Sequence, residues 1–299
     1  MNSKYYKIAD ITIEVRSDLP ITEKTFHPKF THFETNGPGN ENVVVHHHFL
    51  NDIDTKSKST HPVYKKPPWA IYKIENKWLY EWIKPIPPYE NYYRKAVAND
   101  EHTHFDIYND DSIKKKYLEG MLTSLTMFPT DQILLGRLLS YKNGCIIHSL
   151  GIMHNNNGYL FVGHSGAGKS TMAGIMKKES IVLCDDRNII RKIDDNFILS
   201  GTWSHGDVPD VSSSIAPLNG IFFIEQSKTN QLEMIQDNNR IFKMLLACLI
   251  RPLQTAEWWE QSISFLLDLS KKIQCWNLQF DKSGNVLNLI NELELKINL

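Results

Sequence analysis

A glycine-rich segment near the middle of the chain carries the clearest chemical signal in the sequence. An apolar run at residues 158–162 leads directly into Gly163-His164-Ser165-Gly166-Ala167-Gly168-Lys169-Ser170. Glycines at this spacing let the backbone turn so that several N–H groups point at one phosphate, and a following helix directs its positive end at the same anion. The segment therefore predicts a phosphate-binding loop of the Walker A type.

The flanking residues supply the structural context that such a loop needs. Residues 158–162 are predicted to form a buried strand, and residues 169–178 have the apolar spacing of a helix. Lys169 would neutralise β- and γ-phosphate oxygens, and the Ser170 hydroxyl would complete a Mg²⁺ shell. The expected cofactors are ATP and Mg²⁺. The expected nucleotide-binding residues are Gly163, His164, Ser165, Gly166, Ala167, Gly168, Lys169, Ser170 and Thr171.

Two adjacent acids, Asp185 and Asp186, end a second apolar strand predicted at residues 181–184. In open α/β sheets ligands collect at the carboxyl ends of strands, so these acids are expected to face the same crevice as Lys169. Neighbours in an extended segment point to opposite sides of the backbone. The two acids should therefore have different tasks, one holding Mg²⁺ and the other accepting a proton from an attacking hydroxyl.

Histidines are the third group of candidates. His148 is predicted to end the strand before the loop strand, a position where a structural role is more common than a catalytic one. His46-His47-His48 should alternate across a strand and so cannot present three ligands to one metal. His104 has no obvious carboxylate companion. We interpret these other histidines as structural.

The elements that position these residues fall into two regions. Residues 1–111 read as a β-rich N-terminal region, with strands at 8–15, 43–47, 70–74 and 78–83 and a polar loop at 51–60. Its aromatic residues fit either a docking face for an acceptor or partner or ordinary packing. Residues 112–299 read as a catalytic domain that opens with a helix over 112–128 and a second helix capped by Asp131. The expected fold class is α/β, or α+β for the whole chain.

Composition limits the partners. The chain has 299 residues, with 33 Lys plus Arg against 34 Asp plus Glu. This near-neutral balance gives no case for a nucleic-acid partner, and no apolar run is long enough to span a membrane. The N-terminus lacks the layout of a signal peptide, so a cytoplasmic protein is expected. Its four cysteines sit apart among apolar neighbours and are predicted to be buried thiols.

The combination of these motifs resembles a known family. The stretch from His148 through the glycine-rich loop to Asp185-Asp186 is similar to the catalytic domain of HPr kinase/phosphorylase and its related serine kinases, which belong with the phosphoenolpyruvate carboxykinase-like nucleotide-binding proteins. The resemblance continues in Gly201-Thr202-Trp203-Ser204 and in residues 216–226. It covers roughly residues 130–255.

This resemblance implies specific roles. Lys169 would bind phosphate, Ser170 would bind Mg²⁺ and Asp186 would assist the metal. Asp185 would be the acid or base for the attacking hydroxyl, and His148 would lie beside the transferred group. Thr171 departs from the bifunctional enzymes, where Glu usually follows the loop Ser. The Gly-Arg-Asn signature found downstream in those enzymes also has no clear match here. Because these parts are associated with recognition of the HPr protein and with the reverse, phosphorolytic reaction, the resemblance leaves both properties open.

The sequence leads to one function hypothesis with two alternatives. The leading hypothesis is an ATP- and Mg-dependent kinase that transfers the γ-phosphoryl group to a serine-type hydroxyl of a peptide, a small protein or a small molecule. The first alternative is a nucleotide-gated binding module without phosphoryl transfer. The second is an NTPase similar to phosphoenolpyruvate carboxykinase. Homo-oligomerisation is left open.

Overall fold

The computed structural model describes residues 2–50, 61–83, 94–128 and 131–297. The chain divides into two compact units, which are described separately below. The first comprises Met1–Tyr141 with Arg251–Trp259, and the second comprises Lys142–Ile250 with Glu260–Leu299. Both combine helices with extensive β-sheet, so the chain has a mixed α/β fold.

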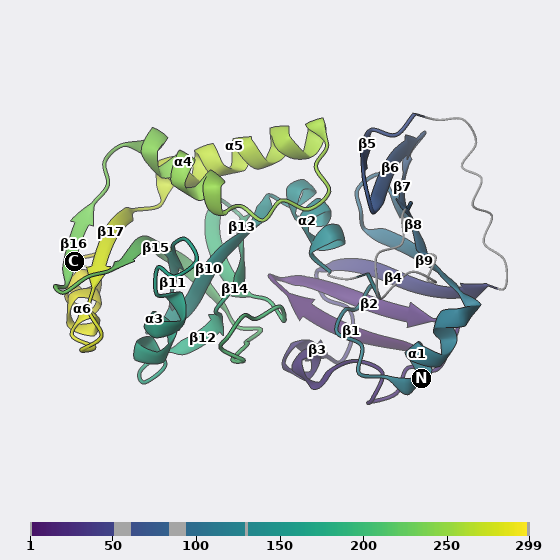
Figure 1. Cartoon of the computed structure of the whole chain (residues 1–299), viewed down its shortest axis with the longest axis horizontal. Coiled ribbons are helices and arrows are strands. Elements are labelled where there is room, and N and C mark those ends of the chain that lie inside the picture. The colour runs from purple at the N-terminus through teal and green to yellow at the C-terminus, as the bar shows by residue number, and fades with distance from the viewer. Residues whose placement is uncertain (1, 51–60, 84–93, 129–130, 298–299) are drawn as a thin grey trace. The chain divides into compact units, whose positions relative to one another are not determined.

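The first unit is built on a nine-stranded sheet with the order β3-β1-β2-β4-β9-β8-β7-β6-β5 (Figure 1). The strands β2, β4 and β9 run parallel to one another, and the remaining neighbours pair antiparallel. The strand bounds are β1 Ser3–Ile8, β2 Ile11–Ser17, β3 Glu34–Thr35, β4 Glu41–Leu50, β5 Tyr64–Lys66, β6 Trp69–Ile74, β7 Lys77–Trp82, β8 Arg94–Asn99 and β9 His104–Asp110. The helical segments are η1 Pro28–Phe33, η2 Asp111–Ile113, α1 Lys114–Glu119 and α2 Gln132–Tyr141.

The first unit extends beyond the boundary expected at residue 111. Tyr117 is fully buried and packs edge-on against Phe49 of β4, with ring centroids 4.9 Å apart. The Leu125 carbonyl is 2.7 Å from His47 Nε2. These long-range contacts join residues 112–141 to the N-terminal sheet, which local sequence patterns do not reveal.

Two predicted elements in this unit differ from the structure. The expected strand over 8–15 contains a hairpin turn, because Ala9 and Asp10 both have positive φ (48° and 62°) and separate β1 from β2. The expected helix over 112–128 ends at Glu119, since Gly120 takes a left-handed φ of 85°. The helix predicted after Asp131 is confirmed as α2. The polar segment 51–60 lies outside the described residues.

The second unit contains eight strands in the order β11-β10-β13-β14-β15-β17-β16, with β12 also pairing with β10 and β11 also pairing with β15. The strand bounds are β10 Gly144–His154, β11 Asn157–Val162, β12 Ile181–Cys184, β13 Arg187–Ile193, β14 Asn196–Gly201, β15 Ile215–Gln226, β16 Gln231–Met234 and β17 Cys275–Phe280. The helices are α3 Lys169–Met176, α4 Asn238–Cys248, α5 Ala256–Lys272 and α6 Val286–Ile297.

The strand β10 is the element that brings the predicted site together. Its first half pairs with β13 up to His148, and its second half pairs with β11 from Ser149 onward. The strand β12 lies on the other side of that second half. Since β11 and β12 are both antiparallel to β10, they run in the same direction, and their carboxyl ends meet beside the same stretch of β10. The sequence predicts His148 at the end of a strand. In the structure it lies within the long strand β10.

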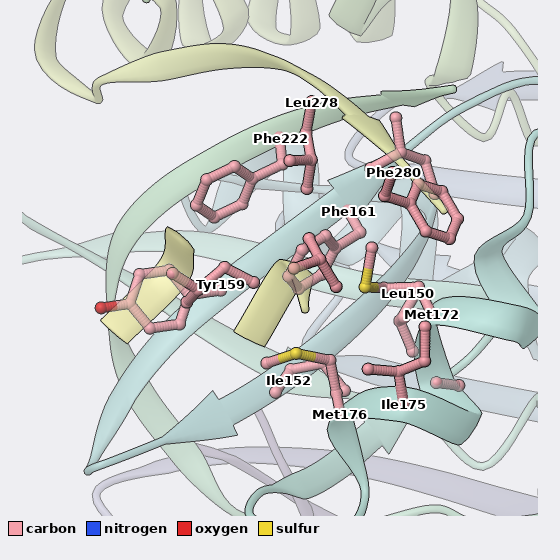
Figure 2. Packing of buried hydrophobic residues seen from close by; sticks show 14 of the residues in the cluster. Leu150, Ile152, Tyr159, Phe161, Met172, Ile175, Met176, Phe222, Leu278 and Phe280 are labelled. Carbon is pink, nitrogen blue, oxygen red and sulfur yellow. The ribbon is translucent and has the colours of Figure 1, made fainter. Parts of the chain in front are cut away.

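A buried cluster fixes the helix that follows the glycine-rich loop. Met172, Ile175 and Met176 of α3 face Leu150 of β10 and Phe161 of β11, as Figure 2 shows. Burial of each such side chain contributes about 2 kcal/mol. The cluster continues into β15 and β17 through Phe222, Leu278 and Phe280. The sheet and its packed helix thus hold the loop between them.

Candidate functional site

The glycine-rich loop connects β11 to α3, as the sequence predicts. Gly166 and Gly168 have left-handed φ values of 84° and 102°. Gly168 is also the N-cap of α3 and supplies no side-chain hydrogen bond to the helix. The first backbone N–H groups of a helix have no partner within it, so the start of α3 keeps donors available for an anion.

Lys169, the first residue of α3, is held against this loop. Its Nζ donates to the Gly163 carbonyl at 2.8 Å and to the His164 carbonyl at 3.4 Å. Burial lowers the pKa of Lys169 below its usual value, an effect that the neighbouring Asp186 and Asp185 oppose. These carbonyls keep the ammonium beside the loop, where it can meet a phosphate.

A pocket of about 400 Å³ lies over the start of α3. Six of the nine expected nucleotide-binding residues line it, namely Ser165, Gly166, Gly168, Lys169, Ser170 and Thr171. Gly163 and His164 line a second pocket instead. Ala167 is only 2 % exposed and belongs to the apolar cluster beneath α3. Gly163, His164 and Ala167 therefore lie outside the pocket of about 400 Å³.

The paired acids have separate sets of partners, as their alternation predicts. Asp185 is buried, and its two carboxylate oxygens accept hydrogen bonds from the backbone N–H groups of Gly206 (2.6 Å) and Val208 (2.7 Å). Asp186 instead lies 3.1 Å from His148 Nε2 and 3.2 Å from Arg187 Nη1. Both acids line the 400 Å³ pocket.

His148 completes this wall of the pocket. Burial is the main cause that lowers its pKa, and the nearby Lys169 lowers it further, while Asp186 acts in the opposite direction. A carboxylate only accepts hydrogen bonds, so Nε2 of a neutral His148 carries the proton that faces Asp186. His148, Lys169, Ser170, Asp185 and Asp186 thus surround one pocket, although they come from three separate segments of the chain.

Sequence reasoning missed three residues of this pocket, Gly206, Asp207 and Gln226. The Gln226 Nε2 donates to Thr171 Oγ1 at 3.3 Å. A Cβ atom on Gly206 would stand 3.2 Å from the Asp185 carboxylate, so glycine allows the close approach of this loop. Gln226 is the last residue of the segment 216–226 in the family resemblance, which assigned it no role. Gly206 and Asp207 belong to no motif with recognisable spacing, and the nearest signal to them is the stretch Gly201–Ser204 within the same resemblance.

A larger pocket of about 800 Å³ lies next to the first. One wall is the sheet, with Val162, Phe223 and Asn277, and the other is α4, with Met244 and Cys248. The lining is mainly apolar, with a smaller polar part. His148 lines both pockets, so its side chain borders both spaces.

The sequence analysis assigned a structural role to the histidines of the first unit, and the structure agrees only in part. His47 is buried, and His46 and His48 lie on the opposite face of β4, as alternation predicts. However, His46 and His48 both lie close to the Asp18 carboxylate. His104 also has a carboxylate nearby, because its Nε2 is 3.6 Å from Asp106. Nothing in the sequence indicates the contacts with Asp18, because this residue follows a different strand, β2, and is distant from the histidines along the chain.

None of the helices among the described residues is both long enough and apolar enough to cross a membrane.

Comparison with known proteins yields distant structural similarity and no sequence match. No family model matches the sequence, and no curated protein matches it. Among solved structures, the Hpr(Ser) kinase/phosphatase from Coxiella burnetii matches with a TM-score of 0.30 and 12% sequence identity. The match covers 52% of this chain and 99% of that chain.

Proposed function

We propose that this chain is an ATP- and Mg-dependent phosphotransferase that moves the γ-phosphoryl group to a serine-type hydroxyl of a peptide, a small protein or a small molecule. We place the reaction in the cytoplasm, where ATP is available. One observation carries the proposal. A Walker A loop, Lys169 and a cluster of His148 with two carboxylates surround the same 400 Å³ pocket.

The loop residues fit a nucleoside triphosphate. The uncapped start of α3 offers backbone N–H groups to phosphate oxygens, and the left-handed glycines allow the backbone to curve around them. Lys169 is already held beside the loop by two carbonyls, and it would exchange one of these contacts for a phosphate oxygen. Binding at this pocket therefore needs little rearrangement of the backbone.

Ser170 and Asp186 fit a magnesium ion in chemical type, since both offer the oxygen ligands that Mg²⁺ prefers. Both line the pocket, and each oxygen of Asp186 keeps a lone pair beyond its contact with His148 or Arg187. A bound Mg²⁺ would neutralise charge on the transferring phosphoryl group.

Transfer joins the acceptor oxygen to the γ-phosphorus, releases ADP and sends the hydroxyl proton to a base on the protein. We assign that base to Asp185, whose carboxylate is fixed by the N–H groups of Gly206 and Val208 while its remaining lone pairs stay available. Asp186 and Arg187 would hold His148 beside the transferred group. Positioning and charge neutralisation would supply most of the rate.

The 800 Å³ pocket is the natural place for the acceptor. It shares the lining residue His148 with the phosphate pocket, so an acceptor seated there could present its hydroxyl to the γ-phosphoryl group. Its walls combine apolar side chains with charged ones such as Glu233 and Arg240, which suits a peptide segment next to the reacting hydroxyl. Since several acceptor classes fit these walls, the test begins with the donor.

The test combines nucleotide binding with label transfer. The full chain is incubated with γ-labelled ATP, Mg²⁺ and a lysate of its source cell, and binding is followed with a fluorescent ATP analogue. We expect Lys169→Ala to lose both binding and transfer, while Lys177→Ala, on the exposed end of α3, keeps both. Asp185→Asn should keep nucleotide binding and lose transfer at least ~100-fold.

Other outcomes separate the alternatives. Transfer by Asp185→Asn at the wild-type rate would contradict the assigned base. Release of labelled phosphate without a labelled acceptor would indicate an NTPase. ATP binding with neither release nor transfer would indicate a nucleotide-gated binding module. Because the amide introduced by Asp185→Asn would face a backbone N–H donor, the melting temperature of this variant must also match that of the wild type.

A further inference from the structure

Three parallel strands of the first unit share a polar face. Side chains alternate along a strand, so Arg16 of β2, His46 of β4 and Asp106 of β9 stand in one row on the same face of the sheet. The next row contains His48 and Tyr108, whose rings stack with centroids 5.1 Å apart. Asp18 follows β2 directly, which brings its carboxylate beside this row.

The Asp18 carboxylate lies between two imidazoles. His46 Nε2 is 3.1 Å from Asp18 Oδ1, and His48 Nδ1 is 3.3 Å from Asp18 Oδ2. One ligand atom from each of the three residues lies within 4.8 Å of the others. Ligand atoms of a tetrahedral zinc site, each about 2.0–2.1 Å from the metal, stand roughly 3.4 Å apart. The spacing of the three side chains is therefore close to that of a metal shell.

A second carboxylate fixes the proton on His48. Its other ring nitrogen, Nε2, lies 3.1 Å from Asp106 Oδ1. Because a carboxylate only accepts hydrogen bonds, Nε2 of a neutral His48 carries the proton and Nδ1 carries a lone pair. The Nδ1 lone pair then faces an Asp18 oxygen, and a positive charge between them, either a metal ion or a second proton on the ring, relieves their repulsion. Histidines that bind metals commonly have such a carboxylate on the other nitrogen.

The neighbouring charges are compatible with a cation at this position. Arg16 is paired with His46 in the same row, and its guanidinium is bound to both Glu14 carboxylate oxygens at 2.8 Å. The side chains of Asp18, His46 and His48 are 44%, 29% and 23% exposed, so a metal bound there would keep a side open to solvent. That opening would admit a water molecule or a ligand atom from a partner.

We propose that Asp18, His46 and His48 form a binding site for a divalent transition metal, and that Zn²⁺ is the ion it fits best. Two imidazoles and one carboxylate form a ligand set that Zn²⁺ accepts, with the fourth position left open. Asp106 is a positioning residue that orients His48. This proposal is independent of the proposed phosphotransferase activity, because all four residues belong to the first unit.

The test is a zinc titration of the full chain after removal of metals by a chelator, with excess Mg²⁺ present and a chromophoric competitor as readout. We expect one Zn²⁺ per chain. His46→Gln, His48→Gln and Asp18→Asn should each weaken binding at least tenfold. His32→Gln, which removes an exposed histidine elsewhere in the first unit, should leave the affinity unchanged. Failure of the wild type to bind zinc, or tight binding that persists in the His46→Gln, His48→Gln double variant, would overturn the proposal.

Two further measurements do not depend on the ligand variants. X-ray absorption of the wild-type zinc complex should show nitrogen and oxygen ligands at about 2.0–2.1 Å, whereas sulfur ligands at about 2.3 Å would place the ion at the cysteines and overturn the proposal. Asp106→Asn should weaken binding about 10–100-fold with one ion still bound. An unchanged affinity in this variant would contradict the orienting role of Asp106.

Discussion

At the scale of single residues, the structure separates two acids that the sequence presents as a pair. Asp185 is buried and held by two backbone N–H groups, whereas Asp186 pairs with His148 and Arg187. The alternation of an extended chain explains the separation, and the sequence predicted it. The identity of the partners came from elsewhere in the fold, because Gly206 and Val208 lie about twenty residues downstream.

Gly168 of the loop has a conformation and surroundings that only glycine fits. Gly168 has a φ of 102°, and a Cβ there would stand 2.7 Å from both Gln226 Nε2 and Phe280 Cζ. We expect Gly168→Ala to distort the loop and to weaken binding of an ATP analogue at least tenfold, since the left-handed conformation is strained for alanine and no space is free. Fluorescence titration of the analogue measures this effect.

Gly174 is the matched control for that substitution. It lies in the same helix, is exposed and has no atom within 4 Å of an added Cβ. Gly174→Ala should therefore keep nucleotide binding and stabilise the protein by about 0.5–1 kcal/mol, because alanine favours the helix. Equal loss of nucleotide affinity in the two variants would show that the loop conformation is not the cause.

At the scale of elements, the pairing of strands determines which candidate site residues lie close together. The strand β10 pairs first with β13 and then with β11 and β12, and His148 occupies the point of exchange. The sequence showed the strands around the loop but not their order, because hydrophobic patterns report burial and leave partners open. A strand predicted to end at His148 therefore continues to His154.

A buried histidine links elements of the first unit and makes its stability depend on pH. His102 lies between β8 and β9, contacts the Tyr80 hydroxyl of β7 and stacks on Tyr141 of α2 with ring centroids 5.1 Å apart. Burial, with smaller contributions from Arg137 and Lys73, lowers the pKa of His102 from 6.5 to about 2. The folded protein therefore favours the neutral imidazole.

The sign of the pH effect follows from that shift. A depressed pKa contributes stability that is fully present above about pH 6.5 and is lost as the pH falls toward 2. Between pH 7.5 and 5.5 we expect a loss of about 1.4 kcal/mol in the free energy of unfolding from this group. Urea unfolding at the two pH values measures the loss.

His102→Asn is the variant that isolates this contribution. Asparagine tolerates the left-handed φ of 55° at this position and does not titrate in this range. The variant should be less stable at pH 7.5, because Tyr80 loses its partner, yet its stability should fall less between pH 7.5 and 5.5. A fall equal to that of the wild type would assign the pH effect to other groups.

At the scale of the whole molecule, the chain does not divide where its composition changes. Residues 112–141 belong to the first unit, and so does the distant segment Arg251–Trp259. Trp258 is 2 % exposed and donates through Nε1 to the Gly136 carbonyl at 3.1 Å. The side chain of Arg137 is fully buried and donates to Thr255. The first unit is thus completed by residues that follow most of the second in sequence.

This division predicts which part of the chain responds to a change at residue 258. Trp258→Ala should destabilise the first unit by about 3–5 kcal/mol, because a large buried side chain is lost. Hydrogen exchange of the full chain should then increase in α2, residues 132–141, more than in β15. Trp259→Ala removes a less buried neighbour and should cause a smaller increase. An unchanged α2 together with faster exchange in β15 would contradict the division.

The sequence by itself determined the glycine-rich loop between a strand and a helix, because that motif is local: its glycines, its lysine and the strand and helix around it lie within about twenty consecutive residues. Only the tertiary structure decided what surrounds the loop. It set the position of His148 within β10, the separate partners of the two acids, the pocket shared with α4, and the approach of Asp18 to His46 and His48. Each of these depends on strand order and register, which arise from packing between distant segments and leave no spacing in the sequence.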